Sequence, residues 1–282
     1  MPGEIDSPSA RSGERSVSVV VPTRNSGTTL RSCLESIVAQ SIRCELIVVD
    51  NGSEDNTLEI ANDLADIVIT AGPERSAQRN IGCAASSGQI VGFVDSDMVL
   101  EPTVAQEARA ALVDGTIAVV VPEYTTGNGY WAEVRAYERS LYIDNDDVEA
   151  ARFFVRTFVD QVGGFNEQLT GGEDWDLDIR IRKLGKVGRT TAQIEHKEGR
   201  VHFLDACRKK GYYAAGYQGF ARQHGTSTLI QIALNRPYVK SPKLLFSKHG
   251  AGLAMLKLGE AISMSLSISR AYGSKRLHQL TK

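Results

Sequence analysis

Short apolar runs alternate with helical patterns through the first half of the chain. The runs have the length of buried strands and are Val17–Val21, Glu45–Val49, Asp66–Thr70, Ile90–Val94 and Ile117–Val121. Between the first two runs, one helical stripe is formed by Leu30, Leu34, Ile37 and Val38. Strands that alternate with helices in this way predict an α/β fold, with a mainly parallel central sheet flanked by helices.

Three more helices are predicted over Glu54–Leu64, Gln78–Ala85 and Thr103–Leu112. Ser53 is placed to cap the first of them, which would leave Asp50 free for another role. In a doubly wound sheet, ligands bind at the carboxyl ends of the strands. Polar clusters occupy three such ends, at Pro22–Asn25, Asp50–Ser53 and Asp95–Asp97.

The second half of the chain is less regular. It predicts a helix over Tyr130–Leu141 and a strand over Arg152–Val155. Another helix begins near Glu173, and one of its faces is formed by Leu177, Ile181 and Leu184. A final amphipathic helix covers about Ala251–Tyr272 and completes a helical C-terminal extension.

The final helix has two distinct faces. Its apolar stripe is formed by Met255, Leu258, Ile262 and Leu266, and the opposite face by Lys257, Glu260, Ser263 and Arg270. The apolar stripe could lie on a membrane surface, pack on the rest of the chain, or meet a second subunit. Core packing is the commonest of the three outcomes.

Composition narrows the class of protein. The 282 residues are 42% hydrophobic and 23% charged with a net charge of −2, so nothing favours nucleic acid as a partner. The four cysteines show no C-x-x-C spacing, which favours reduced core thiols in a cytoplasmic protein. We find no signal-peptide pattern at Met1–Asp6, and no uncharged apolar run reaches the roughly 18 residues that span a bilayer.

Asp95 and Asp97 follow directly on the run Ile90–Val94. Two carboxylates at a strand end can hold Mg²⁺ or Mn²⁺ and leave coordination positions open for diphosphate oxygens. A plain turn or helix cap is the alternative. The imidazole of His196 could complete the coordination, although a lone histidine is more often structural, and His202 is a competing ligand.

Asp50 and Arg79 are candidate contacts for a nucleotide. Asp50 could accept the ring N–H of a uracil-type base, or it could cap the next helix. Arg79 could pair with a diphosphate or with Asp95, or it could be a solvated surface side chain.

Gly171 and Gly172 precede two further carboxylates, Glu173 and Asp174. A helix N-terminus stabilises ionised carboxylates, so one of them could act as a general base, with helix capping as the alternative. We expect Asp176 and Asp178 to face solvent or to pair with Arg180 and Arg182.

Taken together, these segments resemble the family 2 glycosyltransferases of the GT-A fold. The matching segments occur in the family's order and are Val17–Asn25, Val48–Ser53, Arg79–Gly82, Phe93–Asp97, Val162–Glu167 and Gly172–Asp174. The resemblance covers roughly residues 17–199. It implies an inverting, divalent-metal-dependent transfer of a sugar from a nucleotide diphosphate donor, which we expect to be a UDP-sugar.

The resemblance also implies roles for single residues. It gives the nucleoside pocket to Pro22, Thr23, Asn25, Asp50 and Asn51. It places Arg79 near the diphosphate, Asp95 and Ser96 at the ribose or sugar, and the metal on Asp97, with Asp95 and His196 beside it. Asp174 is then the catalytic base and Glu173 its neighbour.

Two departures qualify the resemblance. Met98 stands where many members carry another acid, and the Q-x-x-R-W motif of processive synthases is absent, so a single addition is favoured over polymerisation. The acceptor is expected to be a glycan or a lipid-linked molecule, since the basic, tyrosine-containing stretch Arg208–Tyr213 resembles one in members that use lipid-linked acceptors.

Two other functions remain open. A sugar-1-phosphate nucleotidyltransferase would carry a glycine-rich loop with a lysine after the first strand, and the loop Pro22–Gly27 has one glycine and no lysine. A non-catalytic nucleotide-sugar binding or scaffold protein would not need both Asp97 and Asp174, although both are present.

The expected organisation has three parts. Residues 1–15 form a disordered tail, and 16–200 form the catalytic domain, with a nucleotide-sugar half (16–122) and an acceptor half (123–200). Residues 201–282 form the helical extension. The expected location is cytoplasmic, with the extension in contact with the inner face of the cell membrane as one alternative.

Overall fold

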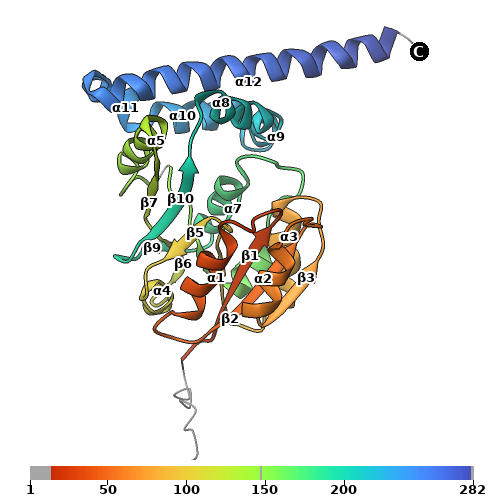
Figure 1. The fold of residues 1–282 in the computed structure, drawn as a ribbon, viewed down its shortest axis with the longest axis vertical. Coiled ribbons are helices and arrows are strands. Elements are labelled where there is room, and N and C mark those ends of the chain that lie inside the picture. Colours follow the sequence, from red (N-terminus) through yellow and green to blue (C-terminus); the bar gives the residue numbers. More distant parts are fainter. Residues whose placement is uncertain (1–13, 147, 281–282) are drawn as a thin grey trace, which may run out of the picture.

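The computed structural model describes residues 14–146 and 148–280, and the predicted tail lies almost entirely outside them. A central seven-stranded sheet has the order β3-β2-β1-β4-β8-β6-β9 (Figure 1). Its strands are β1 (Val17–Thr23), β2 (Cys44–Asp50), β3 (Ile67–Thr70), β4 (Ile90–Phe93), β6 (Thr116–Val120), β8 (Phe153–Val155) and β9 (Lys186–Arg189). All neighbours pair in parallel except β8, which is antiparallel to β4 and to β6. The predicted mainly parallel sheet is therefore confirmed.

Helices cover both faces of this sheet. One core cluster joins the sheet to α1 (Leu30–Val38), α2 (Thr57–Leu64) and α4 (Val104–Ala111). The other joins it to α3 (Arg75–Ala85), α6 (Arg156–Val162) and α7 (Glu173–Arg182). Helix α3 approaches β1 so closely that a Cβ at Gly82 would lie 2.3 Å from Cγ1 of Val20. Glycine at this position thus allows the contact between α3 and the sheet.

A smaller three-stranded sheet stands beside the first. Strand β10 (Ile194–Arg200) is antiparallel to β5 (Met98–Leu100) and parallel to β7 (Glu123–Asn128). The register sets His196 opposite Met98, one residue after Asp97. This pairing is what brings a residue from late in the chain to the end of the Asp95–Asp97 segment.

A layer of helices lies across the end of the molecule that carries β7 and β10 (Figure 1). It consists of α5 (Tyr130–Ser140), α8 (Phe203–Tyr212), α9 (Ala214–His224), α10 (Thr226–Leu234), α11 (Pro237–Lys240), the 3₁₀ helix η1 (Pro242–Phe246) and α12 (Lys248–Leu280). We call this set the helical layer. Its own small core contains Val134, Cys207, Leu253 and Leu256. The predicted helical extension is confirmed, and α12 runs beyond the expected end of the last helix.

The orientation of α12 differs from ordinary core packing. The charged side chains in the middle of the helix, Lys257 and Glu260, face inward. Nζ of Lys257 lies 2.6 Å from Oε1 of Glu138 on α5, and Glu260 is buried. The apolar stripe around Leu258 and Ile262 faces outward and is more than half exposed. Among the described residues, the segment Lys248–Ser269 is also long and apolar enough to cross a membrane by length and composition alone, which the absence of an uncharged run had not suggested.

Other local predictions were corrected or settled. Leu184 was expected on the buried face of α7, but the helix ends at Arg182 and Leu184 is exposed, because the chain turns before that position. Asp176 and Asp178 are buried and pair with Arg180 and Arg182 one helical turn later, so they do not face solvent. The four cysteines are free and buried, as expected.

Acid stability should depend on Glu138. Burial acts to raise the pKa of this carboxyl, but Lys257 and Arg135 outweigh it and lower the pKa from 4.5 to about 2. A carboxyl with a lowered pKa stabilises the fold above its unfolded pKa, and this contribution is lost as pH falls toward the folded value. We expect Glu138→Gln to cost about 3 kcal/mol at neutral pH, and to flatten the fall in stability between about pH 4.5 and pH 2.

Denaturant unfolding at a series of pH values measures this effect. Glu133→Gln is the matched control, because Glu133 lies on the same helix with a half-exposed side chain and should change stability by less than about 1 kcal/mol. Equal pH profiles for wild type and Glu138→Gln would show that the Lys257 pair does not stabilise the layer.

Candidate active site

The first two polar clusters meet at the ends of β1 and β2. The parallel register sets Thr23 beside Asp50, and Asn51 donates its backbone N–H to the carbonyl of Thr23 over 2.9 Å. Nε2 of Gln78 bridges the strands by donating to the carbonyls of Thr23 and Val49 at 2.9 and 2.6 Å. Pro22 lies within β1 at this junction.

Asn25 fixes the loop after β1. Its backbone has φ of 49°, in the left-handed region that asparagine tolerates. Its N–H donates to Oγ of Ser53 over 2.8 Å, and its Oδ1 accepts from the N–H of Glu54 over 2.9 Å. The loops after β1 and β2 are therefore bound to each other, as a shared nucleoside pocket would require.

The prediction that Ser53 caps the next helix and leaves Asp50 free was wrong. Helix α2 begins at Thr57, and Asp50 itself accepts hydrogen bonds from both the N–H and the hydroxyl of Ser53. The segment between them is a turn closed by Asp50, which is fully buried. A carboxylate has about four acceptor positions, so the two bonds from Ser53 leave Asp50 capacity for about two more donors.

Arg79 connects the two halves of the site. Its side chain is completely buried, with Nη2 at 2.7 Å from Oδ1 of Asp95 and Nη1 at 2.9 Å from Oδ1 of Asp174. Glu173 lies 3.6 Å from the same Nη1, and the ring of Phe165 packs against the guanidinium. The predicted partners of Arg79 were a diphosphate and Asp95, and the structure shows the pair with Asp95. The alternative, a solvated surface side chain, is excluded.

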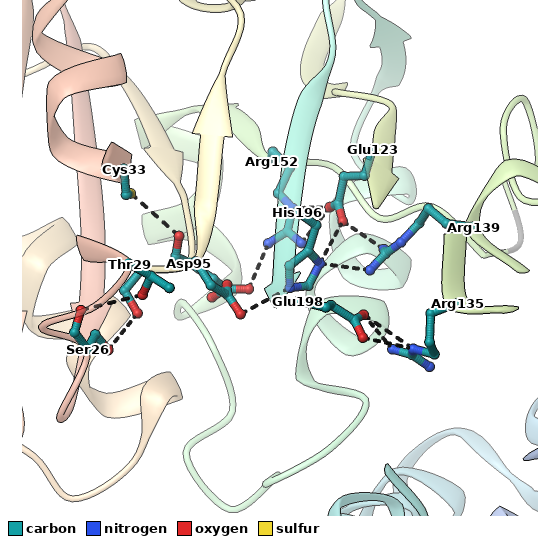
Figure 2. A network of polar contacts seen from close by, with 12 residues as sticks. Ser26, Thr29, Cys33, Asp95, Glu123, Arg135, Arg139, Arg152, His196 and Glu198 are labelled. Atoms are coloured by element: carbon teal, nitrogen blue, oxygen red, sulfur yellow. Dashed lines mark hydrogen bonds and ion pairs between the residues drawn. The ribbon is translucent and has the colours of Figure 1, made fainter. Parts of the chain in front are cut away.

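Asp95 pairs with Arg79 and lies close to Arg152, which Figure 2 shows beside it. Burial acts to raise its pKa, but Arg79, Arg152 and Arg75 together hold the pKa of this carboxyl well below its usual range. Arg152 lies 3.6 Å from Oδ2 of Asp95 and 2.7 Å from Glu123. Asp95 is therefore an ionised carboxylate whose oxygens face guanidinium groups.

Asp97, directly before β5, faces His196 on the paired strand β10. Oδ2 of Asp97 is 3.1 Å from Nε2 of His196, and the Asp97 side chain is 35% exposed. The backbone holds the pair in place, because the N–H of Lys197 donates to the carbonyl of Asp97 over 2.9 Å. The described residues contain no group of three or more His, Cys, Asp or Glu side chains arranged for a metal, and Asp95 is directed toward Arg79.

The other nitrogen of His196 contacts the Glu123–Arg139 pair (Figure 2). Nδ1 is 2.9 Å from Nη2 of Arg139 and 3.8 Å from Oε2 of Glu123. Arginine only donates, so Nη2 of Arg139 donates to Nδ1, and the proton of a neutral ring lies on Nε2, toward Asp97. Glu123 accepts a hydrogen bond from Arg139 and is too far from Nδ1 to accept one from the ring. Burial acts to raise the pKa of Glu123, but Arg152 and Arg139 lower it to about 2, so this acceptor is ionised.

Helix α7 presents its two acids differently. Gly172 precedes it with φ of 81°, which glycine adopts without strain. Glu173 is buried beside Arg75 at 3.0 Å, and its pKa is raised by burial and by the charge of Asp174. The Asp174 side chain is 36% exposed. Asp174 is therefore the acid that a substrate can reach, and Glu173 lies behind it.

Two cavities border this site. One of about 450 Å³ is lined by Asp174, Trp175, Arg200 and Tyr213. The other, of about 300 Å³, is lined by Asn25, Ser26, Ser96 and Asp97. Glu198 and Lys209 line both, so the cavities meet at these two side chains. Asp174 and Asp97 therefore face adjoining spaces, as the acceptor and donor sides of one site would.

Three other histidines do not contact Asp97. His202 lines the larger cavity, without a bond to Asp97. His224 pairs with Asp176 at 2.7 Å, and His249 with Glu133 at 3.0 Å. His202, the competing ligand candidate, is thus further from the carboxylate of Asp97 than His196 is. Ser96 contacts Ser26 through their hydroxyls, at 2.9 Å.

Sequence reasoning missed four charged residues of this site. They are Arg75, Glu123, Arg139 and Arg152. No spacing pattern marks them, because they come from four different elements or loops. The one available signal is that an ionised, buried Asp95 needs more than a single cationic partner.

The chain was compared with known proteins. The profile of glycosyl transferase family 2 matches residues 18–164. The pre-mycofactocin glycosyltransferase of Mycobacterium tuberculosis is 28% identical over 243 residues, which cover 78% of this chain and 51% of that protein. Glycosyltransferase AglE of Haloferax volcanii is 31% identical over 188 residues, which cover 60% of this chain and 62% of that protein. The chain thus spans about half the length of the first of these relatives.

Solved structures show the same fold. S. aureus TarS 1-349 in complex with UDP has a TM-score of 0.55 at 18% identity and covers 92% of each chain. Mannosyltransferase PcManGT from Pyrobaculum calidifontis, in complex with GDP-Man and Mn²⁺, has a TM-score of 0.56 at 18% identity and covers 94% of this chain and 81% of its own. The family profile spans more than half of the residues, and the predicted GT-A fold is confirmed: the chain belongs to glycosyl transferase family 2.

Proposed function

We propose that this protein is an inverting, metal-dependent glycosyltransferase. It would move a single sugar from a nucleotide-diphosphate sugar, which we take to be a UDP-sugar, to a hydroxyl of a glycan or lipid-linked acceptor. The observation that carries the proposal is the placement of Asp174 and Asp97 on adjoining cavities, with His196 facing Asp97 and Arg79 holding Asp174 to Asp95. A base and a cation site on two sides of one cleft are what direct displacement needs.

The donor side would be the smaller cavity and the strand ends beside it. Pro22, Thr23, Asn25, Asp50 and Asn51 would hold the nucleoside, and the loop-to-loop bonds of Asn25 support this role because they preform the pocket. Arg79 and Asp95 would form its floor. Ser96 lines the same cavity. TarS with UDP and PcManGT with GDP-Man have this fold and bind nucleotides, although the base is not fixed by that likeness.

Mn²⁺ or Mg²⁺ would be held by Asp97 and His196. The donor set fits such an ion, because a carboxylate oxygen of Asp97, which lines the smaller cavity, and an imidazole nitrogen of His196 face each other at 3.1 Å. When bound, the ion would neutralise charge on the leaving diphosphate. Asp95 was also predicted as a ligand, and its cationic partners instead support a role in positioning Arg79 and Arg152.

Asp174 would accept the proton of the attacking hydroxyl. Nη1 of Arg79 binds its Oδ1, and the partial exposure of the side chain leaves an oxygen available to the acceptor. Glu173 would be its neighbour and hold Arg75. Attack from the side opposite the diphosphate would invert the anomeric centre.

The acceptor would enter the cavity of about 450 Å³ that Asp174 lines. A third cavity, of about 540 Å³, shares eight lining residues with it, including Trp175 and Tyr217, and continues between α10 and α12 past Ile232, Ala233 and Met264. An aromatic and apolar extension of this kind supports a lipid-linked acceptor over a wholly polar one. We place the enzyme in the cytoplasm with its helical layer at the inner face of the cell membrane, and without nucleic acid partners.

Thermal-shift measurements with nucleoside diphosphates and nucleotide sugars test this proposal. We expect stabilisation by one nucleotide family with Mn²⁺ or Mg²⁺, and none with chelator; a hundredfold excess over the dissociation constant adds about 2.7 kcal/mol. Asp97→Ala and His196→Ala should each weaken the metal-dependent part at least about tenfold. His249→Ala is the matched control, since His249 pairs with Glu133 outside the donor cavity.

The alternatives give different results. A shift that survives in Asp97→Ala would reject the metal site. Donor binding without any release of nucleoside diphosphate would favour the non-catalytic scaffold. No shift with any nucleotide would leave Asp95 and Asp97 as an ordinary strand-end turn.

A further inference from the structure

The outward face of α12 lacks charge. Between Ala251 and Ser269, every exposed position is alanine, methionine, leucine, isoleucine or serine. Met255, Leu258, Ile262 and Leu266 are 51–63% exposed. The exposed face of a helix on a soluble domain is normally the polar one. A solvent-facing apolar stripe of this length indicates a surface that binds something apolar.

The charges of α12 cannot turn outward to cover this stripe. Nζ of Lys257 lies 2.6 Å from Glu138 and 2.8 Å from Glu260, while Glu260 is 3.9 Å from Arg135. These contacts bind the middle of α12 along α5. The orientation of the helix is therefore set by ion pairs on its inner side.

Other exposed apolar side chains belong to the same layer. Ile230 and Leu234 on α10 are 54% and 57% exposed, and Phe246, two residues before α12, is 88% exposed. Figure 1 shows α12 as the outermost element of the layer, extended across the end of the molecule. The apolar surface is thus wider than one helix.

The charge of the chain is divided between its two parts. Residues 206–282 hold 13 lysines and arginines and a single acid, Glu260, whereas residues 1–205 hold 19 basic residues and 33 acids. Lys240 in α11 and Lys243 in η1 are exposed, and both lie in the segment that joins α10 to α12. The helical layer is therefore strongly basic in a chain whose net charge is −2.

We propose that the outward face of α12, with Phe246 and the exposed face of α10, binds an anionic lipid bilayer. Apolar side chains would enter the interface, and Lys240 and Lys243 would contact the headgroups. A bilayer fits better than a second copy of the chain, because two copies would bring basic segments together. The helix would lie in the plane of the interface, since crossing the bilayer would remove Lys257 and Glu260 from their buried partners.

The bilayer proposal makes the location given under the proposed function more specific. It does not depend on the transfer reaction. Lipid binding can be measured on the full chain without donor, metal or acceptor. Failure of the bilayer proposal would therefore leave the glycosyltransferase proposal intact, and the reverse also holds.

Flotation with vesicles of phosphatidylcholine, with and without phosphatidylglycerol, tests the inference. We expect binding to the anionic vesicles, weakened by added salt, and at least about tenfold weaker binding to the neutral ones. Leu258→Glu/Ile262→Glu should lower anionic-vesicle binding at least about tenfold, because both side chains would lose their burial in the interface. Val38→Glu/Val113→Glu is the matched control, since both valines are half exposed, at 51% and 50%, outside the helical layer.

Circular dichroism and thermal unfolding without ligand serve as a folding control for each variant. Should the α12 variant unfold, Lys240→Glu/Lys243→Glu tests the charge part of the surface, and loss of anionic-vesicle binding is again expected. Vesicle binding equal to that of the control variant would overturn the proposal. So would equal binding to neutral and anionic vesicles, or a change from dimer to monomer in the α12 variant when the wild type binds no vesicles.

Discussion

Replacing Asp174 by asparagine is expected to lower the rate of nucleoside diphosphate release by about 10²–10⁴-fold, with donor affinity unchanged. The asparagine carbonyl can still accept the hydrogen bond that Nη1 of Arg79 gives Asp174 at 2.9 Å, so the fold of the site should persist. What is lost is the oxygen that takes the proton of the attacking group. Steady-state kinetics with the donor identified by thermal shift give the rate, and the thermal shift itself gives the affinity.

Two further variants separate Asp174 from its surroundings. Glu173→Gln should retain more activity, because Glu173 is buried and occupied by Arg75. Asp160→Asn is a control at an exposed carboxylate on α6 and should have no effect. Near wild-type release by Asp174→Asn would remove it as the base, and a larger loss in Glu173→Gln would transfer the role to Glu173.

Arg79→Met should destabilise the protein by about 3–5 kcal/mol and remove donor binding. The substitution leaves Asp95 and Asp174 without a guanidinium that now lies 2.7 and 2.9 Å from them, and Asp95 is largely buried. Removing one member of a buried charge cluster leaves an uncompensated charge, which costs more than the pair contributed. Denaturant unfolding measures the stability change.

Arg31→Met is the control for this experiment. Arg31 also has two acidic partners, Asp63 and Glu35, but all three side chains are about half exposed. We expect almost no change in the free energy of unfolding there, because solvent screens exposed ion pairs. Arg79→Lys should restore part of the stability without full activity, because an ammonium cannot reach both carboxylates with a planar fork. Similar unfolding energies for Arg79→Met and wild type would contradict the central role of Arg79.

The sequence predicted the sheet and the positions of the polar clusters well, for a physical reason. Short apolar runs such as Ile90–Val94, in alternation with helical patterns, are typical of buried strands, and the first polar residue after each run marks the strand's end. Asp50 and Asp95 were located in this way. The antiparallel insertion of β8 was not predictable, because pairing direction depends on contacts between segments distant in the chain.

The contacts of the charged side chains could not be predicted. Whether Asp50 or Ser53 closes a turn depends on backbone angles that either residue type tolerates. The direction of α12 is a second example: amphipathicity identifies two faces, but which of them packs inward was decided by Glu138 and Arg135 on another helix.

The buried position of Arg79 has a consequence for how the binding of one substrate affects the binding of the other. One guanidinium binds Asp95 on the proposed donor side and Asp174 on the proposed acceptor side, so a displacement of either carboxylate is transmitted to the other. Thermodynamic linkage then requires that the coupling be reciprocal: a donor that changes acceptor affinity has its own affinity changed by the acceptor to the same degree. The two substrates should therefore bind cooperatively, and a single side chain would set the size of that coupling.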